Sequence, residues 1–257
     1  MAKKNSQLFN SWVLFTVATL LLSAGWLMKS LPLFIFVGFA PLFAITDQAK
    51  DHKSPWNRFE LILLSLTVSL FAATLFDTQM LVFILIQAIL FTLTFVGYSF
   101  AYQSLGSRLG KFTIIFFWLG VEYILLKLPW SEQTLFLADA MQLQASWLNW
   151  TDHVGYLGAS LWILVVNLIF YLSFFQKKEF NGYYFTAGIA LIIVPILFSY
   201  QTKTTGISRS EMISLYTHGS SVSEKYMNQG ELIARTAAWI SVLIILLSFV
   251  KNQTRKK

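Results

Sequence analysis

Apolar residues run along this 257-residue chain in long blocks that are separated by short polar stretches. A helix that crosses the hydrocarbon core of a bilayer needs about 20 mostly apolar residues, and several blocks have roughly that length or slightly less. The pattern therefore predicts an all-α integral membrane protein, an eight-helix transmembrane bundle that forms a single domain over residues 1–257. The expected helices lie near 11–28, 31–46, 59–77, 79–102, 112–129, 154–175, 182–200 and 231–250.

The second predicted helix is the shortest, and two prolines bracket it. Pro32 and Pro41 cannot donate a backbone hydrogen bond. We expect this helix to tilt, to break or to cross only part of the membrane. The first helix follows two lysines, as the core of a secretory leader would, but its apolar run is long and no small-residue cleavage site follows it. We therefore expect it to be a retained helix.

Composition and charge refine this class. Hydrophobic residues make up 56% of the chain and charged residues only 12%, which excludes an ordinary soluble domain. The formal net charge is +7, but the basic residues lie at the ends of the predicted helices, so we expect no nucleic-acid partner. With the N-terminus in the cytoplasm, eight crossings place 13 of the 19 Lys and Arg residues on the cytoplasmic side. Both termini are therefore predicted to be cytoplasmic.

Two longer stretches lie outside the predicted helices, both on the outer side. Residues 130–153 carry Trp130, Trp147 and Trp150 among apolar and acidic residues, which is typical of a loop lying at the membrane interface. Residues 201–230 are polar and rich in Ser and Thr. A stretch of this length cannot form a domain with its own core, since chains below about 40 residues rarely fold alone.

One acid, Glu122, interrupts the apolar block from Phe116 to Trp130. A charged side chain near the bilayer centre costs about 2.5–3.5 kcal/mol on insertion scales, so such a residue usually has a partner. Two interpretations stay open. Glu122 is either a structural carboxyl, protonated or bonded to a Tyr, Trp or Asn of a neighbouring helix, or it lines a polar cavity that opens outward. Asn167 and Gln87 also lie within apolar blocks and are suited to joining helices.

Four segments, in order, resemble a known family. FFWLGVEYILLKLPW, followed by ASWLNWTDHVGYLGASLWILVVNLIFY, resembles the membrane domain of bacterial apolipoprotein N-acyltransferases, in which an aromatic helix with a W..xEY pattern precedes an outer loop. PLFIFVGFAPLFAITDQ is similar to the second helix of that family, and TTGIS with GELIARTAAWISVLIILLSFV resembles its C-terminal end. The resemblance spans most of the chain and implies the bacterial cytoplasmic (inner) membrane. It also implies a lipid or partner cavity facing the outer leaflet, which we expect to be lined by Trp118, Glu122, Tyr123, Trp162 and Asn167.

The catalytic part of that family is missing from this chain. In the family, a nitrilase-like domain with a Glu, Lys and Cys triad stands between the seventh and eighth helices, where this chain has only the remnant 201–230. The chain has no cysteine, so it cannot form the thioester intermediate in the manner of the family. We therefore expect a pseudoenzyme with no catalytic residues and no cofactor. Three scattered histidines have no metal-ligand spacing, so no metal site is predicted.

Three functions compete on this basis. The first is a non-catalytic relative of the acyltransferase that binds phospholipid or lipoprotein acyl chains and acts as an accessory factor in lipoprotein handling or envelope export. The second is a structural subunit of a larger membrane protein complex. The third is the membrane half of a split acyltransferase whose catalytic chain docks on the outer face. The expected partners are membrane phospholipid, with lipoproteins or other envelope membrane proteins as candidates.

Overall fold

The computed structural model describes residues 9–28, 32–50, 55–106, 110–176, 179–201 and 224–254. All secondary structure in these ranges is helical, with no strand, which confirms the predicted all-α class. The α-helices are α1 (Ser11–Leu27), α2 (Ile35–Gly38), α3 (Ala40–Lys50), α4 (Trp56–Ala73), α5 (Leu81–Leu105), α6 (Thr113–Leu126), α7 (Leu157–Phe174), α8 (Gly182–Gln201) and α10 (Glu224–Thr254). The 3₁₀ helices are η1 (Pro32–Phe34), η2 (Thr78–Met80), η3 (Gly110–Phe112), η4 (Ser131–Gln133), η5 (Leu137–Trp147) and η6 (Asn149–His153).

Six stretches within the described residues are long and apolar enough to cross a bilayer, so the chain is a multi-pass membrane protein. The other two predicted crossings, 11–28 and 112–129, contain the shorter helices α1 and α6, of 17 and 14 residues. At 1.5 Å per residue these helices are about 25 and 21 Å long, less than the hydrocarbon core of about 30 Å. The six long stretches are Pro32–Ala49, Trp56–Ala73, Thr78–Leu105, Leu157–Phe174, Gly182–Gln201 and Leu232–Thr254.

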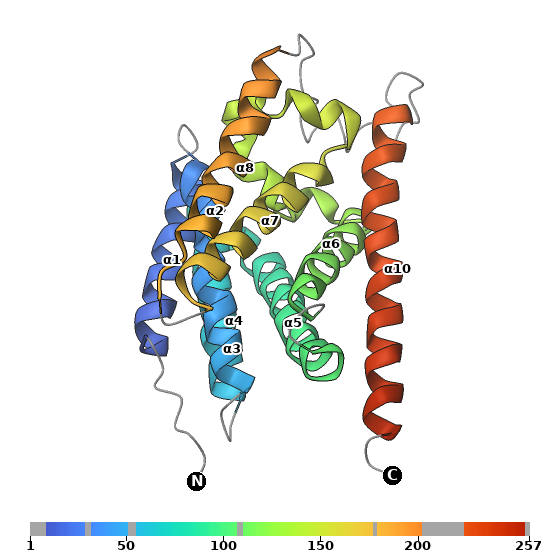
Figure 1. Cartoon of the computed structure of the whole chain (residues 1–257). Coiled ribbons are helices and arrows are strands. Elements are labelled where there is room, and N and C mark those ends of the chain that lie inside the picture. Colours follow the sequence, from blue (N-terminus) through green and yellow to red (C-terminus); the bar gives the residue numbers. More distant parts are fainter. Residues whose placement is uncertain are drawn as a thin grey trace.

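The first turn of α1 and the last turn of α10 lie at the same end of the bundle (Figure 1). The 3₁₀ helices η4, η5 and η6 lie towards the opposite end, where α8 also ends (Figure 1). This second end is called the loop end below. Of the predicted outer loop 201–230, residues 202–223 lie outside the described residues, and the chain from Glu224 onward is already helical in α10.

The second predicted crossing is divided into η1, α2 and α3, with a break at Phe39 between α2 and α3. The prolines explain both features. Pro32 begins the short 3₁₀ turn, where a missing N–H costs nothing. Pro41 lies two residues beyond the break and cannot donate to the carbonyl four residues earlier, so the helical ladder is interrupted here.

The core of the bundle is aromatic and centres on Trp118 of α6, which is 1% exposed. Its ring stacks on Phe91 of α5 with centroids 3.9 Å apart and an interplanar angle of 9°. It also meets the edge of Phe39 from the broken helix, at 5.0 Å. Aromatic pairs contribute about 0.5–1.5 kcal/mol beyond the area they bury, so this cluster stabilises the junction of α5, α6 and the broken helix.

Helix α10 lies at the edge of the bundle and packs against α6 and α5 (Figure 1). At Gly120 of α6 the two backbones come so close that a Cβ would lie 3.2 Å from the Cα of Ala238, which explains the small residues on both helices. Further along α10, the hydroxyl of Ser104 donates to the backbone carbonyl of Ser248 at 3.4 Å. These contacts seat α10 on α6 in its first half and on α5 in its second.

Candidate functional site

Glu122 is fully buried on α6 and holds the segment that follows its own helix. Its Oε1 accepts hydrogen bonds from the indole N–H of Trp118, at 3.1 Å, and from the backbone N–H of Leu137, at 3.0 Å. The hydroxyl of Ser160 on α7, also fully buried, lies near this carboxyl group, although neither it nor Oε2 makes a hydrogen bond of good geometry. The acid therefore connects α6 to the start of η5 and to α7.

Three consecutive backbone N–H groups at residues 135–137 are bonded to side chains rather than to a helix or strand. Leu135 donates to Gln87 Oε1 at 3.1 Å, and the Gln87 amide donates back to the Leu135 carbonyl. Phe136 donates to Asp139 Oδ2 at 2.7 Å, and Leu137 donates to Glu122 as above. Non-helical backbone at membrane depth is tolerated only where protein groups satisfy it. These three side chains meet that requirement here.

The segment expected at the interface is thus partly inside the bundle. Its stretch from Phe136 to Met141 is buried, with exposed fractions between 0% and 7%. Asp139 within this stretch also accepts a hydrogen bond from the hydroxyl of Tyr156. The acids Glu122 and Asp139 are therefore both buried near the loop end, and each is bonded to backbone of the same short segment.

Asn167 provides hydrogen-bond partners for two backbone groups at the break in the second crossing. Its Oδ1 accepts from the backbone N–H of Phe39 at 2.8 Å, and its Nδ2 donates to the carbonyl of Ile35 at 2.8 Å. In a continuous helix these two backbone groups would bond to each other, since they are four residues apart. Nδ2 also donates to Ile163 of its own helix at 2.8 Å. The amide is fully buried and has its hydrogen-bonding groups occupied by backbone.

The tryptophans near the loop end also bond to backbone or to other rings. Trp162 donates from Nε1 to the carbonyl of Leu191 at 2.6 Å, and Trp150 meets its ring edge-on with centroids 5.6 Å apart. Trp147 donates to the hydroxyl of Tyr200 at 3.3 Å. Trp162 therefore joins α7 to the middle of α8, Trp147 joins η5 to the C-terminal end of α8, and Trp150 packs η6 against α7.

The structure thus brings Trp118 and Glu122 into direct contact, as their spacing of four on one helix implies. Tyr123 is half-buried, and the ammonium group of Lys127 lies 5.6 Å from the centre of its ring. Trp130 packs against Phe83 of α5, with centroids 5.6 Å apart. Asn167 and Trp162 hold other helices from α7, as described above.

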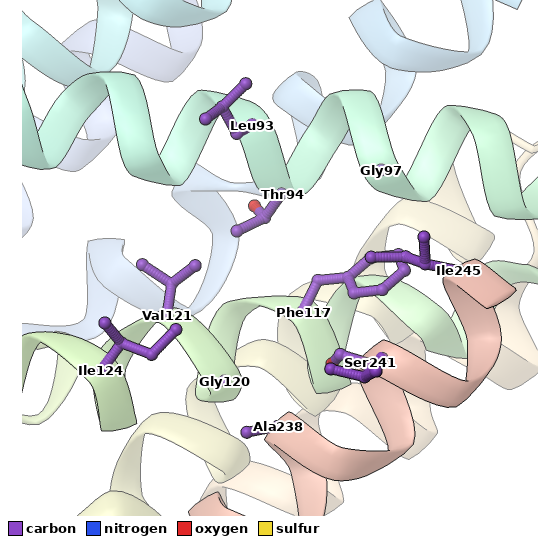
Figure 2. A pocket seen from close by; sticks show the side chains of 11 residues that line it. Leu93, Thr94, Gly97, Phe117, Gly120, Val121, Ile124, Ala238, Ser241 and Ile245 are labelled. Atoms are coloured by element: carbon purple, nitrogen blue, oxygen red, sulfur yellow. The ribbon is translucent and has the colours of Figure 1, made fainter.

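A cavity of about 260 Å³ lies between α5, α6 and α10, and none of the predicted cavity residues lines it. Figure 2 shows its side chains converging from the three helices. We call it the α5–α6–α10 groove. Its lining residues are Leu93, Thr94, Gly97, Phe117, Gly120, Val121, Ile124, Ala238, Ser241, Val242 and Ile245.

The groove is lined by apolar residues, and its few polar groups are not free to bond to a ligand. Its two hydroxyl groups are already bonded to their own helices: Thr94 donates to the carbonyl of Phe91 at 2.6 Å, and Ser241 donates to that of Ala237 at 2.7 Å. Charged side chains are absent from its lining. The groove therefore offers shape and dispersion contacts to a ligand, which suits a hydrocarbon chain and excludes recognition of a polar group within it.

Helix α6 has two faces with different roles. Trp118 and Glu122 face the interior and the segment after the helix, whereas Phe117, Val121 and Ile124 face the groove. A helical spacing of three or four residues places each set on one face. The acid at Glu122 marks the interior face of α6 in the sequence, whereas the face towards the groove has no such signal, because every residue on it is apolar or glycine.

Among the described residues, no group of three or more His, Asp or Glu side chains is placed to hold a metal ion. Comparisons of the chain with protein-family models, with curated proteins and with solved structures find no match.

Proposed function

We propose that this chain is a non-catalytic membrane protein that binds the acyl chain of a phospholipid or a lipoprotein in the α5–α6–α10 groove. In this proposal it resembles the membrane domain of apolipoprotein N-acyltransferases without their catalytic domain. It resides in the bacterial cytoplasmic membrane with eight crossings and cytoplasmic termini, and it serves as an accessory factor in lipoprotein handling or envelope export.

The observation that carries this proposal is the groove itself. It is apolar, it has a volume of about 260 Å³, and its hydroxyl groups are internally bonded. Ligand pockets for drug-sized molecules usually have about 300–1,000 Å³, so the groove suits one hydrocarbon chain better than a complete diacyl lipid. Its residues on α5 and α10 lie in the middle of long apolar stretches that can cross a bilayer, and in this proposal they meet lipid acyl chains there.

The absence of cysteine supports a binding role over acyl transfer by a thioester. Glu122 and Asn167 support the same conclusion, because their hydrogen-bonding groups mainly hold backbone segments together. In this proposal these polar residues maintain the shape of the bundle, and the groove on the opposite face of α6 makes the contact with lipid.

The test uses the purified chain in nanodiscs of bacterial phospholipid that contain a trace of phospholipid with a photoactivatable acyl chain. We expect crosslinks at groove residues, mapped by mass spectrometry. Val121→Trp fills the groove and should reduce these crosslinks at least fivefold. Val194→Trp is the matched control, because Val194 lies on α8 and is 62% exposed. Equal labelling of the wild type and both variants would contradict the proposal.

Purification in a mild detergent separates the competing functions. Bound diacyl lipid or lipoprotein supports the accessory role. A stoichiometric nitrilase-like chain would instead support the membrane half of a split enzyme, and a defined complex without either would support a structural subunit. Transfer of an acyl group to a lipoprotein amine by the purified chain alone would overturn the non-catalytic assignment.

A further inference from the structure

The groove has two different ends, which follow from the directions of its helices. Helices α5 and α10 run away from the loop end, whereas α6 runs towards it (Figure 1). Leu93 on α5 and Ile124 on α6 therefore lie at the end of the groove nearer the loop end. Gly97 on α5, Phe117 on α6 and Ile245 on α10 lie at the other end.

The end nearer the loop end is open. Leu93 is 55% exposed and Ile124 is 54% exposed, so neither side chain is covered by the bundle. At the far end Ile245 is 46% exposed, but Phe117 is only 6% exposed, and beyond it α10 is tied to α5 by the hydrogen bond from Ser104 to the carbonyl of Ser248.

Phe117 closes the far end. It is only 6% exposed, and its ring reaches from α6 to α5, where it lies 3.4 Å from the position that a Cβ on Gly97 would take. The ring and the side chain of Ile245 lie at the same end of the groove in Figure 2. The space between α5 and α6 is therefore blocked at this level by a rigid aromatic ring.

We infer that Phe117 is the end stop of the groove and determines how long a segment of acyl chain it accepts. This inference rests on the proposed function. A chain enters between Leu93 and Ile124 and extends along α6 until its terminal methyl group contacts the Phe117 ring. A chain shorter than the groove leaves part of the lining without dispersion contacts, and a longer chain leaves methylenes in the bilayer that make no contact with the groove. The groove should therefore select by chain length.

The experiment measures which chains crosslink to the groove when the nanodiscs contain an equimolar series of phospholipids with photoactivatable terminal groups on chains of increasing length. The wild type should crosslink one narrow range of lengths at Phe117 or Ile245. In Phe117→Ala the range should shift to chains longer by about two to four methylene groups, the space that the ring occupied in a close-packed interior. Phe117→Leu fills more of this space and should shift the range by less.

Ile124→Ala is the matched control, because it enlarges the open end. It should weaken crosslinking of all lengths without moving the range. If Phe117→Ala is poorly folded, Phe117→Leu decides the question. Folded variants that keep the wild-type range overturn the end stop and leave acyl-chain binding intact. A wild type that crosslinks no chain in the groove overturns the proposed function as well.

Discussion

The side-chain amide of Asn167 lies between the backbone N–H of Phe39 and the carbonyl of Ile35, two groups that would bond to each other in a continuous helix. The side-chain oxygen accepts from Phe39 N–H at 2.8 Å, and the side-chain nitrogen donates to Ile35 at 2.8 Å. The amide is thus inserted into the helical ladder of the second crossing, which is a recognised cause of a sharp helix break. A polar residue of α7 therefore fixes the shape of a helix more than a hundred positions earlier in the chain.

The first prediction concerns this bridge. Asn167→Leu removes the donor and the acceptor at once, and it leaves Phe39 N–H and Ile35 C=O without their partner in a fully buried place. We expect a loss of about 1–3 kcal/mol of unfolding free energy. Thermal unfolding in detergent measures it. Thr186→Ala is the control, because its hydroxyl is exposed and bonds only within α8. A fully stable Asn167→Leu protein would mean that the two backbone groups bond directly and that Pro41 alone sets the break.

The second prediction distinguishes the negative charge of Glu122 from its role as a hydrogen-bond acceptor. Glu122→Gln keeps an acceptor for Trp118 and Leu137 and offers a donor to Ser160, so it should fold like the wild type. Glu122→Leu removes the acceptor and should lose about 1–3 kcal/mol. Hydrogen exchange of the peptide over 135–141 measures the local effect, which should be large for Leu and small for Gln. Equal damage by both variants would show that the carboxylate charge itself is needed.

Much of the fold could be predicted from the sequence because its signals are local. The apolar blocks predict helices of the right class, and Pro32 and Pro41, which bracket the second block, predict a helix that tilts, breaks or crosses only part of the membrane. The ends of the blocks are less informative. The helix predicted over 59–77 is α4, which ends at Ala73, before the end of the apolar block. The chain then turns before η2. In an apolar block, sequence gives no sign of where the helix stops.

The site could be predicted only in part, for a physical reason. A lone Glu122 or Asn167 in an apolar block signals a buried partner, but the partners are backbone groups at Leu137 and Phe39, which have no signature in the side-chain pattern. The groove depends on which apolar face of α6 remains incompletely covered. Phe117 and Trp118 are adjacent and both apolar, so hydropathy cannot distinguish the face that packs from the face that lines a cavity.

The third prediction tests how α10 is seated. Because the chain has no cysteine, paired cysteines can be introduced without background. Ser104→Cys with Ser248→Cys should form a disulfide on mild oxidation, since the Ser104 hydroxyl reaches the Ser248 backbone at 3.4 Å. Ser104→Cys with Ser241→Cys is the control. Its second cysteine lies seven residues, or about 10 Å, further along α10, so the pair should stay reduced. Reversed results would place α10 in a different register and would remove the groove as described.

The fourth prediction tests the orientation that the basic residues indicate. Glu132 and Gln253 are both exposed. Glu132 belongs to η4, which lies towards the loop end, whereas Gln253 belongs to the last turn of α10, at the other end of the bundle (Figure 1). In spheroplasts, Glu132→Cys should react with a membrane-impermeant maleimide, whereas Gln253→Cys should react only after permeabilisation. The opposite pattern would invert the protein in the membrane. It would also turn the open end of the groove, at Leu93 and Ile124, from the outer leaflet to the cytoplasmic leaflet, so that the bound chain would have to come from a cytoplasmic-leaflet lipid.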